Sequence, residues 1–279
     1  MASKYEIRSI SLPPRSHPTA LSIEENLNKL KTWEASSTST SGSICIGLSG
    51  LEDLCIGVNH LFNMSSTQEV LSYYQKEKCL HNLLDGSVRI LDICGITRDV
   101  MLQFKDQVQA LQSALRRRKG YSSIEGSIAS YSCFTKKMKK EAKKSIAVLK
   151  QMGSKLKASP LQDHHLIQLF KEVIAMSSSV FQSLFSFLST SKPKQNRWSM
   201  VSKLMQKGAQ ACEEKQEIVN QLESVDAALS EKPHFGQMQI AQKRLEALEI
   251  SIQDIENCLE SVFKHLIKTR ASILNIISQ

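Results

Sequence analysis

The sequence has 279 residues, of which 41% are apolar, 23% charged and 6% aromatic, so the chain is long enough to enclose a sizeable core. Its 11 glycines and 6 prolines are about half the ordinary share, which disfavours β-sandwiches, barrels and turn-rich α/β folds and favours long helices. The formal net charge is +9, and most of it comes from one stretch in the middle of the chain.

Cysteine usage and the start of the sequence bear on the cellular compartment. The 7 cysteines are scattered and form no CxxC pair, and residues 1–11 contain no apolar run of the kind that a secretory signal needs. A reduced, cytoplasmic setting is therefore expected. The Ser- and Arg-containing N-terminus leaves plastid targeting as an alternative.

Residues 1–18 are predicted to form an extended basic arm, because the prolines within them prevent a regular helix or a central strand. Phosphorylation of a serine in this arm would reverse its local charge. The candidate phosphorylation sites are Ser9, Ser11 and Ser16. The simpler interpretation is that these serines are ordinary polar residues of an extended tail.

Residues 19–43 are predicted to hold a short helix followed by a linker. A capping box precedes three apolar residues at three-residue spacing, the last of which is Trp33. The polar run ASSTSTSGS at 35–43 is typical of a flexible linker. We expect residues 44–279 to form a single α-helical bundle domain.

Apolar stripes and helix-start signals recur along the rest of the chain. The first predicted helix of this part follows Ser49, and the others lie at about 67–83, 86–118, 122–152, 160–190, 196–230 and 236–277. The Asp85-Gly86 pair before the helix at 86–118 is either a turn or a tolerated interruption, and Asp85 is a candidate cap.

The clearest periodicity lies at the C-terminal end. From Met238 to Ile276, apolar residues recur with alternating spacings of three and four, as in a coiled-coil seam. The seam could pack against the helix at 196–230, or 238–276 could pair with a second copy in a homo-oligomer; the short connection favours the first arrangement. The predicted fold class is all-α: an elongated bundle of long antiparallel helices with a C-terminal coiled-coil-like helical hairpin.

The predicted helix at 160–190 is apolar almost all round, which is typical of a buried helix. Residues 173–190 contain no charge and approach the minimum length of a membrane span, but they include many serines. A central position in the bundle is therefore favoured, with membrane apposition as the alternative.

A basic block occupies residues 110–160, which contain thirteen basic residues and two acidic ones. It could bind an acidic protein or an anionic membrane surface, whereas nucleic acid is disfavoured because no DNA- or RNA-binding motif surrounds it. The alternative without a binding role is a solvated helix face that the acidic stretch at 204–260 partly neutralises. The residues assigned to the anionic-partner surface are Arg116, Arg117, Arg118, Lys119, Lys136, Lys137, Lys139, Lys140, Lys143 and Lys144.

The sequence contains no motif that specifies a reaction. The only close Cys/His groupings are Cys79-x-His81 and His164-His165, and neither has a second pair at zinc-site spacing. No GxSxG elbow, dinucleotide fingerprint or P-loop is present. We therefore expect no catalytic, cofactor-binding or metal-binding residue.

Several stretches resemble a known family. The arm RSISLPPRSHP at 8–18, the segment LLDGSVRILDICGITRDVMLQFKDQVQALQSALRRRKG at 83–120 and SIEGSIASYSCFTKKMKKEAKK at 123–144 are similar to the plant-specific BYPASS-related proteins. The resemblance implies a helical protein without an established enzymatic activity, in a family whose founding member is linked to root and shoot development. It supplies no catalytic residue. Among its matched positions, Asp92 and Arg98 are interpreted as pairing with neighbouring helices, and Gly95 as permitting close helix approach.

Taken as a sequence, the chain is predicted to be a non-enzymatic interaction or scaffold protein with an unidentified protein partner. The alternative is a peripheral membrane protein that binds anionic lipids through the basic block and the helix at 160–190. A third hypothesis is a small-molecule enzyme or carrier with a pocket inside the bundle, for which the sequence names no residues.

Overall fold

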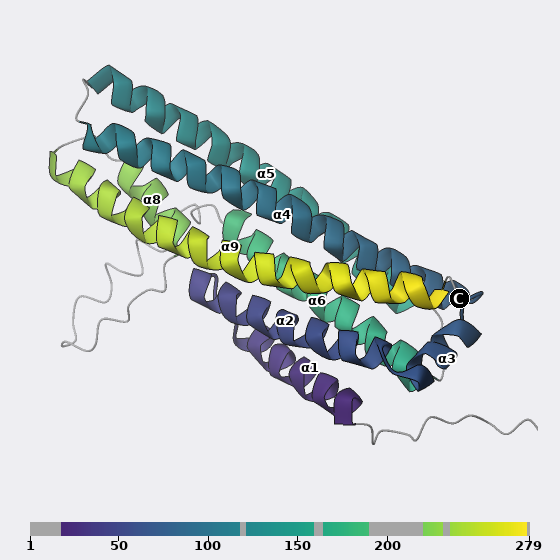
Figure 1. Cartoon of the computed structure of the whole chain (residues 1–279). Coiled ribbons are helices and arrows are strands. Elements are labelled where there is room, and N and C mark those ends of the chain that lie inside the picture. Colours follow the sequence, from purple (N-terminus) through teal and green to yellow (C-terminus); the bar gives the residue numbers. More distant parts are fainter. Residues whose placement is uncertain (1–17, 118–120, 159–163, 190–219, 231–234, 278–279) are drawn as a thin grey trace, which may run out of the picture.

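A computed structural model describes residues 18–117, 121–158, 164–189, 220–230 and 235–277 (Figure 1). These residues form helices and short connections, and no strand occurs among them. The predicted all-α bundle is therefore confirmed. The N-terminal arm, with Ser9, Ser11 and Ser16, lies outside the described residues, as do Arg118, Lys119 and most of the predicted helix at 196–230.

The helices keep close to the predicted ranges. They are α1 (Pro18–Ser36), α2 (Ser41–Phe62), α3 (Ser65–Tyr73), α4 (Lys78–Arg116), α5 (Tyr121–Ala158), α6 (His165–Ser189), α8 (Gln221–Leu229) and α9 (Phe235–Ile277). The three longest, α4, α5 and α9, extend for about 60 Å each at 1.5 Å per residue. They determine the elongated shape of the bundle in Figure 1.

Three boundaries differ from the prediction. The helix α3 ends at Tyr73 rather than near residue 83. The helix α2 starts at Ser41, inside the predicted linker, because the Thr40 side chain caps it by accepting a hydrogen bond from the backbone N–H of Ser43. The helix α4 starts at Lys78, so Asp85 lies within it rather than at its cap. A Cβ atom on Gly86 would lie 3.2 Å from the Ile174 side chain, so this glycine permits close packing of α4 and α6.

Helix α9 lies between α4 and α2 along most of its length (Figure 1). It runs antiparallel to α4 but parallel to α2, because Ser41 contacts Ser251 while Asn59, further along α2, donates to the backbone of His265. The predicted seam is buried inside the chain, from Ala241 to Ile276. Helix α8 covers only its beginning, and α2 and α4 cover most of the rest.

Helix α6 occupies the interior of the bundle, where it packs against α5, α4 and α2. Apolar residues are buried along its whole length, and the ring of Phe170 meets that of Phe62 edge-on at 5.1 Å. Its apolar surface is therefore used in the core.

Helix α1 shares this core through a row of glycines on α2. Cβ atoms built on Gly47 and Gly50 would lie 2.4 Å from Trp33 and 2.7 Å from Leu30, so only glycine lets α1 approach so closely. The Trp33 indole N–H also donates to the carbonyl of Ser43 at 2.8 Å. The apolar stripe ending at Trp33 thus packs on α2 as part of one continuous core.

Candidate anionic-partner surface

Helix α5 carries a core-facing stripe and a basic stripe on opposite sides. Tyr131, Met138, Ala142, Leu149 and Met152 are buried at spacings of three, four and seven, which places them on one side of the helix. At 100° per residue, the lysines between 136 and 144 other than Lys139 lie within an arc of about 120° on the other side. The local sequence therefore directs these lysines away from the core.

We define the α5 lysine face by its five exposed members. They are Lys136, Lys137, Lys140, Lys143 and Lys144. Lys144 makes an ion pair of 2.9 Å with Glu141 on the same helix, an exposed pair that contributes little stability. Within the described part of the chain, the other four lysines make no ion pair.

The electrostatic effect of this face is visible at Glu141. The hydrogen bond from Lys144 lowers the pKa of Glu141, and the charges of Lys144, Lys140 and Lys137 lower it further. One carboxylate thus faces several cations within three helical turns. The surface retains an excess of positive charge.

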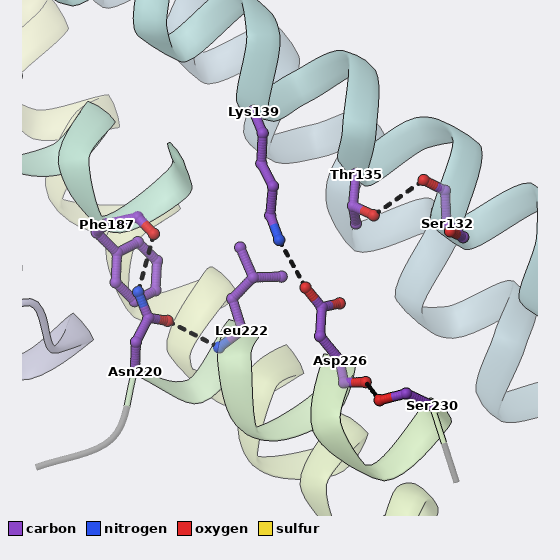
Figure 2. A network of polar contacts seen from close by, with 8 residues as sticks. All are labelled: Ser132, Thr135, Lys139, Phe187, Asn220, Leu222, Asp226 and Ser230. Carbon is purple, nitrogen blue, oxygen red and sulfur yellow. Dashed lines mark hydrogen bonds and ion pairs between the residues drawn. The ribbon is translucent and has the colours of Figure 1, made fainter. Parts of the chain in front are cut away.

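Lys139 differs from its neighbours because it lies toward α8. Its Nζ atom is 2.6 Å from Asp226, and both side chains are mostly buried (Figure 2). Helix α8 is fixed in place by Asn220, whose side chain accepts from the N–H of Leu222 at 2.8 Å and donates to the carbonyl of Phe187 at 2.9 Å. In this arrangement Lys139 joins α5 to α8 and presents no free cation to a partner.

The arginines at the end of α4 lie apart from the α5 lysine face. Arg116 pairs with Glu246 of α9 at 3.2 Å, and Arg117 is exposed. Lys136 is 15 residues beyond the start of α5, which corresponds to about 22 Å along the helix. The structure therefore does not bring Arg116 and Arg117 together with the lysines.

The carboxylates of the acidic stretch that lie on α9 have partners mainly on α4, and none of the partners recorded for them lies on α5. Glu260 pairs with Arg98, which also lies 4.2 Å from the ring centroid of Phe263, and Glu256 pairs with Lys105 at 2.9 Å. Further along, Glu249 accepts hydrogen bonds from Gln109 and Gln112. Among the described carboxylates of this stretch, Asp226 alone pairs with the lysine run, through Lys139, so these carboxylates leave most of the α5 lysines without a partner.

The family-matched positions are placed as follows. Arg98 pairs with a neighbouring helix, as expected, whereas no ion pair is recorded for Asp92 in the described part of the chain. A Cβ atom on Gly95 would meet Phe263 at 3.7 Å, an ordinary contact distance. Gly86, rather than Gly95, is thus the position of close helix approach on α4.

The described residues include no group of three side chains suited to a metal ion. The closest approach to a catalytic constellation lies between α2 and α9, where Ser261 donates a hydrogen bond to Glu52 and His265 Nε2 is 3.7 Å from the same carboxylate. The carboxylate stands between the hydroxyl and the imidazole, so the histidine is not placed to activate the serine. Among the residues described, we find no feature of a catalytic site.

One described helix, α2, has the length and composition of a membrane span, although almost half of its most apolar window is buried in the bundle. A core helix of a soluble protein passes the same test, so this is weak support for a span. The sequence pointed instead to residues 160–190, whose described part, α6, is packed in the core.

The fold and this surface define a class: a helical bundle with a lysine-rich outer face and no recognisable catalytic centre among its described residues. The family model described as Protein BPS1 matches residues 47–276, which is most of the chain. The chain belongs to this BYPASS-related family, whose molecular function is unknown. No curated protein and no solved structure matches the chain.

Proposed function

We propose that this chain is a non-enzymatic interaction or scaffold protein that holds an anionic protein partner on the α5 lysine face. The observation that carries the proposal is the contrast between four exposed lysines without an ion pair on α5 and the three cations of α4 that pair with α9, Arg98, Lys105 and Arg116. By its family resemblance, we place this role in plant development or signalling and expect it in the cytoplasm.

Electrostatics support a binding role for this face. Like charges at spacings of three and four residues repel one another along a helix, and this cost is relieved when a polyanion binds. The face is continued toward the C-terminal end of α5 by the exposed Lys150 and Lys155. A partner with several acidic residues would therefore be attracted along several helical turns, with an association that weakens as salt screens the charges.

The test is recovery of native partners with three versions of the full chain. The face variant carries Lys136→Glu, Lys137→Glu and Lys140→Glu. The matched control carries Lys243→Glu, Lys268→Glu and Arg270→Glu, which make the same charge change at exposed positions of α9. We expect the face variant to lose a partner that the control retains. Equal recovery with all three versions would refute the proposal.

A membrane role is the alternative, because the same lysines could contact anionic lipid headgroups. Co-sedimentation with vesicles of phosphatidylcholine alone and with added phosphatidylserine distinguishes the two partners. A salt-sensitive preference for the anionic vesicles, lost in the face variant, would favour the membrane role.

We also retain Ser9, Ser11 and Ser16 as proposed phosphorylation sites, to be checked by phosphopeptide mapping of the protein isolated from plant tissue.

A further inference from the structure

A hollow lies at the end of the bundle that α6 does not reach, between α5 on one side and α8 and α9 on the other. Helix α6 ends at Ser189, and at this end of the bundle α8 packs chiefly on α9. The ion pair between Lys139 and Asp226 connects α8 to α5 (Figure 2). Beyond that pair, α5 stands apart from α8 and α9, with the end of α4 between them. This hollow is open to solvent on one side and has a volume of about 470 Å³.

The walls of this hollow are mainly apolar and come from four helices. They include Leu115 of α4, Ile124 and Ile128 of α5, Ala228 and Leu229 of α8, and Met238 of α9. Ile128, Leu229 and Met238 are only partly buried, so each still exposes apolar surface to water. Covering that surface with an apolar molecule would be favourable.

Polar side chains line the hollow from α5 and from α9, where Gln237 is the polar lining residue. Glu125 and Ser132 are seven residues apart on α5, on the same side of the helix, and both line the hollow. The Glu125 side chain is exposed and makes no ion pair within the described segments. A carboxylate accepts hydrogen bonds and repels anions, so the preferred ligand carries a hydroxyl or amino group rather than an acid.

The dimensions favour a small molecule over a helix. The lining residues extend over about 12 Å of α5 but only about 6 Å of α9, one helical turn. A two-turn peptide helix about 10 Å wide would fill roughly 800 Å³, which exceeds the space. The observed volume lies within the range of small-molecule sites.

We propose that this hollow between α5, α8 and α9 binds a compact apolar molecule that carries a hydroxyl or amino group. The body of the ligand lies against Ile128, Leu229 and Met238, and its polar group donates a hydrogen bond to Glu125. This site does not involve the α5 lysine face, so the two proposals stand or fall separately.

The first test uses N-phenyl-1-naphthylamine, an uncharged fluorescent dye with one N–H group. We expect saturable binding to the full chain at a single site. Ala129→Phe, at an exposed position that lines the hollow, should weaken binding at least tenfold. Ala147→Phe, at an exposed position of the same helix outside the hollow, should change it less than twofold. Equal effects of the two substitutions, or binding that does not saturate, would overturn the site.

The second test compares 1-naphthol, 1-naphthylamine and 1-naphthoate as competitors of the dye, because they share one ring system. We expect the first two to displace the dye at concentrations at least fivefold lower than the acid. The opposite order would overturn the role of Glu125.

The third test observes ligand binding in the chain without any substitution in the hollow. In protein labelled with ¹³C at the methionine methyl groups, 1-naphthol should shift the Met238 signal, identified by its loss in Met238→Leu. The signal of Met152, buried near the other end of α5, should stay in place. Shifts at Met152 without a shift at Met238 would refute the proposed location.

Discussion

Helices α4 and α5 are neighbours of almost equal length, yet they use their charged residues differently. Three cations of α4, Arg98, Lys105 and Arg116, pair with carboxylates of α9, and these pairs help to fix how the two helices align. Helix α5 meets α4 instead through aromatic rings, since Phe104 lies 6.3 Å from Tyr131 and 6.0 Å from Phe134. Its lysines are thereby left for solvent or a partner, which shows that charge content alone does not define a binding surface.

The largest expected difference between the two helices is in the rate at which their cysteine thiols are alkylated. Burial raises the pKa of the Cys94 thiol on α4 to about 12, whereas Cys133 on α5 is exposed. At pH 8 only about one Cys94 in 10,000 would be the reactive thiolate, and this fraction rises about tenfold per pH unit. We expect iodoacetamide to modify Cys133 at least 1,000-fold faster than Cys94, as measured by peptide mass spectrometry. Comparable rates would contradict the burial of Cys94.

Phe104→Ala should have the largest effect on stability, because it removes a fully buried ring at the α4–α5 interface. We expect a loss of about 3–5 kcal/mol in the free energy of unfolding, measured by urea denaturation. Leu102→Ala, at an exposed position of α4, is the matched control and should change stability by less than about 0.5 kcal/mol. A small effect of Phe104→Ala would mean that α5 is held mainly by other contacts.

Lys105→Glu tests the paired side of α4. It places a carboxylate beside Glu256, where the side chains are mostly buried, and should lower the free energy of unfolding by about 2 kcal/mol. Combining it with Glu256→Lys restores opposite charges and should recover at least half of the loss. An additive double variant would show that the pair does not couple α4 to α9.

Lys139→Gln and Lys140→Gln give the sharpest comparison within α5, because the two lysines are adjacent in sequence. Lys139 is bonded to Asp226 and its loss should cost about 1–2 kcal/mol, whereas loss of the exposed Lys140 should cost less than about 0.5 kcal/mol. Both are measured by urea denaturation. Equal costs would contradict the placement of α8 against α5.

Periodicity explains why the helices could be predicted from the sequence. The seam of α9 and the apolar stripes of α4 and α6 are local patterns, and each stripe is buried as a 3.6-residue repeat requires. Which helix packs on which stripe depends on contacts between distant parts of the chain, so local sequence does not predict it. The seam of α9 is covered largely by α2 and α4, because long elements adjacent in space bury more of it than the short α8 can.

The same distinction applies to the candidate surface. The exposed positions of Lys136 and Lys140 follow from the helical repeat of α5, so the sequence could predict them. The position of Lys139 depends on α8, more than 80 residues further along the chain, and that of Arg116 depends on α9. Heptad-like spacing of Glu246, Glu249, Glu256 and Glu260 along α9 was the one signal that could have indicated a charged seam with α4.

The most direct test of the account is equilibrium binding of a fluorescent poly-L-glutamate to the full chain, followed by anisotropy at 50 and 300 mM NaCl. We predict salt-sensitive binding that falls at least tenfold in Lys136→Glu/Lys137→Glu/Lys140→Glu and less than threefold in Lys243→Glu/Lys268→Glu/Arg270→Glu. Equal losses in the two variants, or binding that salt does not weaken, would contradict the claim that α5 carries the anion-binding surface.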